Sequence, residues 1–182
     1  MAISFRNTNI PYRPECHLNF TGIDEKINFR ALTIETDKGN GAYHGTIDIA
    51  EKSAEGDLLL DNFNIGNDIQ VSNRFDISKS GDNTLLQSES LDINGHDLGS
   101  CTIKADTGSM KGEISVSKNG IRNLSIRGEQ IPGKNYRGYI TTERLDLKAA
   151  EAALNRNLIP GFIRMDLDSE LFFITTGDNL YV

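Results

Sequence analysis

A short unit of two apolar residues, separated by one polar or small residue, recurs along most of this chain and constrains its fold more than any other feature. With a period of two, the apolar side chains of each unit share one face of a β-strand and the intervening residues share the other. Such one-sided strands are typical of antiparallel sheets, because parallel sheets are usually covered on both faces. The clearest units are Leu32/Ile34, Ile47/Ile49, Phe63/Ile65, Ile69/Val71, Phe75/Ile77, Leu91/Ile93, Ile114/Val116 and Leu124/Ile126.

The residues between these units favour tight turns. Asn94-Gly95 and Asn119-Gly120 are dipeptides that readily adopt the two positive φ angles of a type I′ hairpin turn. Further turns are predicted at Gly39-Asn40-Gly41, Ser80-Gly81-Asp82 and Pro132-Gly133. The units recur at uneven intervals, which indicates a long meander and not a solenoid of fixed period.

One helix is predicted at about residues 146–158. Asp146 can cap its first turn, and Pro160-Gly161 should end it. Its apolar face would be formed by Leu147, Ala150, Leu154 and Leu158. The chain is therefore expected to be a single mainly β domain over residues 1–182, a long antiparallel meander. Its sheet should curl or form a groove, because one short helix covers only part of an apolar face.

The charge and hydropathy patterns exclude several classes of partner. A formal net charge of −7 argues against a nucleic-acid binder, which needs a basic surface. Residues 111–164 nevertheless carry ten Lys/Arg against five Asp/Glu, either as an anion-facing surface or packed beside acidic strands. No apolar run reaches the roughly 18 to 20 residues of a membrane span.

Cysteine and histidine positions predict neither a metal site nor a cofactor. Cys16 and Cys101 are isolated, so buried free thiols are expected, with a single disulfide between them as the open alternative. His17, His44 and His96 lie far apart and lack the spacing of common metal motifs.

The segment Asp106-Thr107-Gly108-Ser109 matches the local signature of aspartic proteases, in which two such loops pair their aspartates. No second copy of the signature occurs, so activity would require a dimer that joins two Asp106 carboxylates. The same residues are those expected of a β-turn, which is the favoured interpretation. We therefore predict no catalytic residues and no enzymatic activity, with the dimeric protease as a remote alternative.

Two stretches resemble bacterial cell-envelope proteins. The order of elements over residues 57–116, with Asp61-Asn62-Phe63-Asn64-Ile65 followed by a strand pair and Leu91-Asp92-Ile93-Asn94-Gly95-His96-Asp97-Leu98-Gly99, resembles part of the YdgA family. The stretch from Tyr139 to Leu154 is similar to the repeated units of AsmA-like proteins. This resemblance implies a β-rich envelope protein that carries lipid along a hydrophobic groove, with no catalytic motif.

The leading hypothesis is accordingly a non-enzymatic cell-envelope protein that binds lipid or a protein partner along a concave apolar sheet face. The residues expected to face that partner are Phe63, Ile65, Leu91, Ile93, Leu124, Ile126 and Phe173. A periplasmic location is expected if the chain is a fragment of such a protein, and a cytoplasmic one otherwise. The alternative is an acidic protein-interaction module, such as a secretion-associated component or a toxin-neutralising protein.

Overall fold

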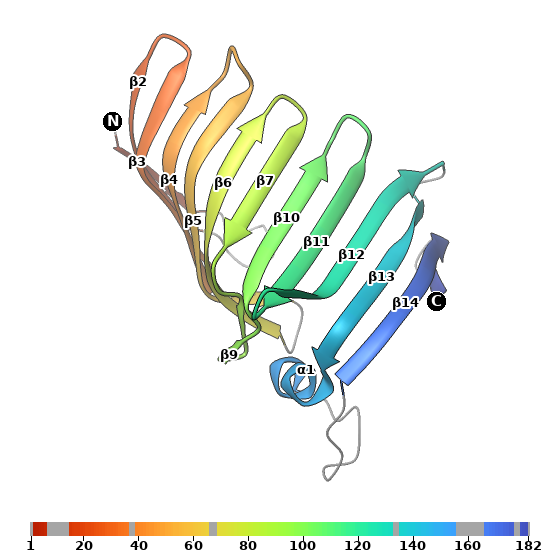
Figure 1. Ribbon diagram of the computed structural model, residues 1–182. Helices are drawn as coiled ribbons and strands as arrows, with labels where there is room; N and C mark the ends of the chain where they lie inside the picture. The colour runs from red at the N-terminus through yellow and green to blue at the C-terminus, as the bar shows by residue number, and fades with distance from the viewer. Residues whose placement is uncertain are drawn as a thin grey trace.

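The fold is one open antiparallel sheet whose strands follow one another in chain order. A computed structural model describes residues 2–6, 15–36, 39–65, 69–132, 135–155, 166–176 and 179–181. Figure 1 shows a curved sheet with the β2–β3, β4–β5, β6–β7 and β10–β11 turns along one edge and α1 and β9 at the opposite strand ends. The predicted long antiparallel meander with one late helix is confirmed.

The strands of the main path are β1 (Ala2–Arg6), β2 (Glu15–Ile23), β3 (Lys26–Thr36), β4 (Gly39–Asp48), β5 (Ser53–Ile65), β6 (Ile69–Ser80), β7 (Asn83–Ser88), β10 (Ser100–Asp106), β11 (Lys111–Lys118), β12 (Ile121–Ile131), β13 (Asn135–Asp146), β14 (Asp166–Thr176) and β15 (Asn179–Tyr181). A small hairpin of β8 (Asp92–Ile93) and β9 (His96–Asp97) lies off this path and pairs with β6. The first and last strands of the path are not paired with each other, so the sheet is not closed into a barrel.

The alternation seen in the sequence gives the sheet two different faces. The strand registers place Phe75, Cys101 and Val116 on one face, called here the apolar face. The opposite face, called the polar face, carries mostly charged and hydroxyl side chains, including those of Arg127 and Arg137. Three register shifts at β-bulges, between β2 and β3, between β3 and β4, and between β5 and β6, keep the apolar residues of these strands on one face.

The core is small and lies on the apolar face. Phe75, Cys101 and Val116 are buried, and two residues of the loop around the β8–β9 hairpin, Leu91 and Leu98, pack against them. Within the described residues no large side chain is completely buried. A single sheet layer with so little cover leaves much of its apolar face in contact with solvent.

The loop that contains the β8–β9 hairpin covers one end of the apolar face, and α1 (Leu147–Leu154) lies beside this hairpin. Asn94 and Gly95 have φ angles of 52° and 77°, which confirms the predicted type I′ geometry. The Asn94 side-chain amide donates to the carbonyl oxygen of Ala153 at 2.6 Å and so ties the hairpin to the helix. The second predicted turn, Asn119-Gly120, is confirmed by φ angles of 56° and 77°.

The helix is shorter than the predicted range of 146–158. Asp146 caps it as expected, since its carboxylate accepts from the backbone N–H of Lys148 at 2.8 Å and of Ala149 at 3.2 Å. The helix ends at Leu154 because Asn155 adopts a left-handed conformation with φ 51°. Leu158 and Pro160-Gly161 lie outside the described residues.

The turn predicted at Gly39-Asn40-Gly41 is wrong, because these residues begin strand β4. Gly39 has a φ of 131°, and a Cβ there would lie 2.6 Å from the Cα atom of Phe63. A bulge between Leu60 and Phe63 brings β5 this close. Glycine is therefore needed at position 39 because β5 leaves no room for a side chain, and not because the chain turns there.

Cys16 and Cys101 are both buried and unpaired, which confirms the free thiols. They sit on β2 and β10, six strand spacings apart, or about 29 Å at the usual spacing of about 4.8 Å. Burial raises the pKa of the Cys101 thiol, which keeps it in the unreactive protonated form.

Candidate functional site

A continuous row of apolar residues crosses the apolar face at right angles to the strands. Cross-strand pairing joins its members in sequence, from β2 to β14. The apolar row consists of Phe20, Phe29, Gly45, Gly56, Ile77, Leu86, Ile103, Ile114, Ile126, Ile140 and Leu171. It crosses eleven strands and hence ten spacings, a length of about 48 Å.

Much of this row is open to solvent. Ile114 is 39% exposed and Leu171 is 43% exposed, although both lie on the face that also holds the core. The other large side chains of the row are only partly buried. Contiguous apolar surface of this extent is uncommon on a monomeric protein and indicates a surface that binds something.

Aromatic rings cover the glycines that interrupt the apolar face. The Tyr43 hydroxyl donates to the carbonyl oxygen of Glu55 at 3.0 Å, and a Cβ on Gly45 would lie 2.5 Å from that hydroxyl. Burial of this phenol raises the pKa of Tyr43. Phe29 lies 6.0 Å from Tyr43 between ring centroids, which extends the aromatic patch toward the N-terminal strands.

At the other end of the sheet, Phe173 covers a second glycine pair. The Cζ atom of Phe173 is 3.6 Å from where a Cβ of Gly128 would lie and 2.8 Å from that of Gly138. Gly128 and Gly138 face each other across β12 and β13. The tip of the ring therefore lies against bare backbone, as aromatic side chains do when they compensate for glycine in a sheet.

Six of the seven predicted partner-facing residues fall into three groups. Leu91 and Leu124 pack against the core. Ile126 and Phe173 lie on the apolar face, where Ile126 belongs to the apolar row. Phe63 and Ile93 both oppose Val71, and they sit near the covered end of the same face. For Ile65 the structure describes the backbone pairing with Ile69 alone.

The sequence did not indicate a second feature, a groove of about 810 Å³ on the polar face, called here the polar groove. It extends across strands β6, β7 and β10 to β14 near their turn ends. Charged side chains line its centre, and Tyr139 and Phe172 lie at one end. The groove thus joins strands that are distant in sequence.

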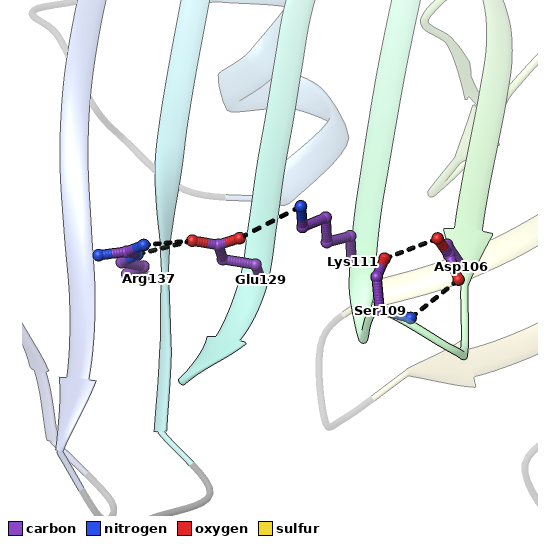
Figure 2. A network of polar contacts seen from close by, with 5 residues as sticks. All are labelled: Asp106, Ser109, Lys111, Glu129 and Arg137. Atoms are coloured by element: carbon purple, nitrogen blue, oxygen red, sulfur yellow. Dashed lines mark hydrogen bonds and ion pairs between the residues drawn. The ribbon is translucent and has the colours of Figure 1, made fainter. Parts of the chain in front are cut away.

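Charges of alternating sign cross this groove in register. In one row, Lys111 faces Glu129 and Glu129 faces Arg137. The Glu129 carboxylate accepts from Arg137 Nε at 2.8 Å and lies 3.7 Å from Lys111 Nζ (Figure 2). In the adjacent row, the carboxylate of Glu113 lies 3.1 Å from Arg127 Nε. Hydrogen bonding from Arg137 lowers the pKa of Glu129.

Asp106 is the last residue of β10, directly before the turn to β11. Its carboxylate accepts from the Ser109 hydroxyl at 2.6 Å and from the Ser109 backbone N–H at 3.0 Å (Figure 2). These bonds, that of the Ser109 side chain first, lower the pKa of Asp106. An aspartate that accepts from both the side chain and the backbone N–H of the residue three positions later is typical of a turn, which supports the β-turn interpretation of this segment.

This turn makes a testable prediction about protonation. Replacing Ser109 with alanine removes the hydroxyl donor and is expected to raise the pKa of Asp106 toward its ordinary value of about 3.9. Because the folded-state pKa is depressed, the contribution of Asp106 to stability is present above its unfolded pKa and is lost as the pH falls through the folded pKa. Carboxyl carbon NMR titration of the parent and of Ser109→Ala measures both values. An unchanged pKa in the variant would contradict the assigned cause.

Within the described part of the chain, no group of three or more His, Cys, Asp or Glu side chains is arranged to hold a metal ion. Among those same residues, no helix is both long and apolar enough to cross a membrane. Comparison of the chain with family models, curated proteins and solved structures finds no match. The function is therefore inferred from the two faces of the sheet.

Proposed function

We propose that this chain is a non-enzymatic binding protein that holds lipid acyl chains along its apolar row. The observation that carries the proposal is the row itself, eleven residues on eleven strands without a single polar side chain. Covering such a surface with hydrocarbon recovers roughly 25 cal/mol for each Å² removed from water.

The composition of the row favours acyl chains over a protein partner. A protein interface usually forms about one hydrogen bond per 100–200 Å². In the interior of the sheet the backbone groups are already bonded between neighbouring strands, and the apolar row offers no side-chain donor or acceptor. An acyl chain needs neither hydrogen-bond donors nor acceptors. It can lie along the row in any position, because it has no polar groups that must be aligned with the protein.

The resemblance of residues 57–116 and 139–154 to YdgA and AsmA-like proteins agrees with this function and is the reason for proposing a location in the cell envelope. A periplasmic location would follow for a chain that belongs to such a protein. Both points are part of this proposal, as is the absence of catalytic activity.

Lipid binding is tested with a phospholipid that carries a fluorescent acyl chain. We expect its emission to increase on titration with the protein, because the probe leaves water. Ile114→Asp should abolish this increase, since it puts a charge in the middle of the apolar row. The side chain of Ile114 is already partly exposed, so the variant should still fold.

Leu59→Asp is the matched control, because Leu59 is 48% exposed but lies on the polar face. It should bind the probe like the parent protein. Light scattering of the lipid-free protein separates the alternatives. If the protein does not bind the probe and instead forms a dimer that Ile114→Asp dissociates, the apolar row contacts a second copy and the lipid proposal is wrong.

A further inference from the structure

The polar groove carries opposite charges in nearly equal number. Its charged side chains are those of Lys104, Lys111, Arg127 and Arg137 and of Asp106, Glu113 and Glu129, four cations and three anions. Most of them pair with one another across adjacent strands. A strongly charged ligand would meet repulsion from half of them, and a polyanion such as nucleic acid would be disfavoured.

Paired charges still leave many hydrogen-bonding positions free. A guanidinium has five N–H donors, and a carboxylate accepts about four hydrogen bonds. Arg127 uses Nε for Glu113, and Arg137 uses Nε and one terminal nitrogen for Glu129. The remaining donors and acceptors are held in place by these ion pairs. Lys104, whose ammonium forms no ion pair within the described residues, is a further donor.

An exposed aromatic pair forms one end of the groove. Tyr139 and Phe172 are 49% and 48% exposed, and their ring centroids are 5.3 Å apart in an edge-to-face arrangement. Because they face each other on β13 and β14, their positions are fixed by the strand register. Exposed rings beside fixed polar groups offer an apolar surface for a ligand that is otherwise hydrophilic.

The face of a sheet recognises ligands through side chains alone. The strands below the groove, β10 to β13, pair with a neighbour on both sides, so their backbone groups are already used. An extended peptide, whose own N–H and C=O groups need partners, gains little here compared with a free strand edge. A ligand with many hydroxyl groups, no net charge and apolar C–H surfaces satisfies all three features of the groove.

We infer that the polar groove is a binding site for a neutral oligosaccharide. One sugar ring stacks on Tyr139 and Phe172, and the following rings lie along the alternating charges and exchange hydrogen bonds with Arg127, Glu129 and Arg137. The groove crosses seven strands, about 29 Å, which gives room for several sugar rings. This site is on the face opposite the apolar row and is independent of the proposed lipid binding.

The test uses isothermal titration calorimetry with three neutral hexasaccharides, namely maltohexaose, cellohexaose and chitohexaose. We expect at least one to bind, with a dissociation constant on the order of 0.1 to 1 mM. Removing both rings in Tyr139→Ala/Phe172→Ala should weaken that binding at least tenfold. Because the ligand is uncharged, raising the salt concentration should leave the affinity nearly unchanged.

Tyr136→Ala is the matched control, because Tyr136 lies on the same strand and is similarly exposed but belongs to the opposite face. It should keep the parent affinity. Since the aromatic pair is exposed, the double variant should fold, and Phe172→Ala alone provides a second reading. Absence of binding to all three sugars, or equal affinity in the double variant and in Tyr136→Ala, would overturn the inference. Neither result bears on the apolar row.

Discussion

Phe75→Ala is expected to lower the free energy of unfolding by about 3 kcal/mol, the lower end of the range for removing a buried phenylalanine. Phe75 is only 5% exposed and is the largest member of the core formed with Cys101 and Val116. The cavity would lie between a single sheet layer and the loop that holds Leu91 and Leu98, so few neighbours can move in to fill it. Since proteins of this size are stable by only about 5 to 15 kcal/mol, the loss is a large share of the total.

Urea unfolding followed by circular dichroism measures this loss, and Phe172→Ala is its control. Phe172 is the same residue type in the same sheet but is half exposed, so its removal should cost less than about 1 kcal/mol. If both variants lost the same stability, the small cluster around Phe75 would not be the core.

Gly138→Ala should destabilise the protein by about 2 to 3 kcal/mol, even though it adds only one methyl group. Its Cβ would lie 2.8 Å from the Cα atom of Gly128 and 2.8 Å from Phe173 Cζ, and would press on the carbonyl oxygen of Arg127. Two of these three obstacles are backbone, so β12 and β13 would have to separate. The Phe173 ring would also leave the glycine pair that it covers.

Gly112→Ala provides the comparison, because Gly112 on β11 is the other glycine that pairs with Gly128 on β12. The nearest atom to its Cβ would be the carbonyl oxygen of Lys104 at 3.6 Å, an ordinary contact. Alanine costs less conformational entropy than glycine, so this variant should be neutral or gain up to about 1 kcal/mol. In thermal unfolding, Gly138→Ala should therefore be clearly less stable than the parent protein, and Gly112→Ala should be at least as stable as the parent. A similar loss in both would mean that glycine at 138 is not required by the closeness of the strands.

The period-two pattern was sufficient to predict the sheet and its antiparallel order, and the capping residue Asp146 with a helical spacing of apolar residues was sufficient to predict the single late helix. The Asn119-Gly120 and Asn94-Gly95 turns were also predictable, because only a few dipeptides accept two positive φ angles in succession. The helix end was missed because Asn155 can either continue a helix or end it in the left-handed conformation. Gly39 was assigned to a turn because its actual role depends on a bulge in a different strand.

The polar groove was not predictable, because its charged residues become neighbours only through the residue-by-residue pairing of adjacent strands. A two-residue turn at Asn119-Gly120 pairs Lys118 with Ile121, and continuing that register would place Glu113 opposite Ile126. The bulge between Val116 and Ser117 shifts the pairing by one residue and brings Glu113 opposite Arg127. A bulge carries little signal of its own in a single sequence, yet it decides which side chains share a face.

The strict chain order of the strands has a consequence for how the molecule folds and opens. Every strand of the main path pairs with its nearest predecessor and successor on that path, as repeat units do in a linear array. Such a sheet can grow from one hairpin by the addition of neighbouring strands, without the slow closure of long loops. Protection of its backbone amides from hydrogen exchange should also be lost in stages, from β1 and β15 inward. The last amides to exchange with solvent should be those of β6, β10 and β11 around Phe75, Cys101 and Val116.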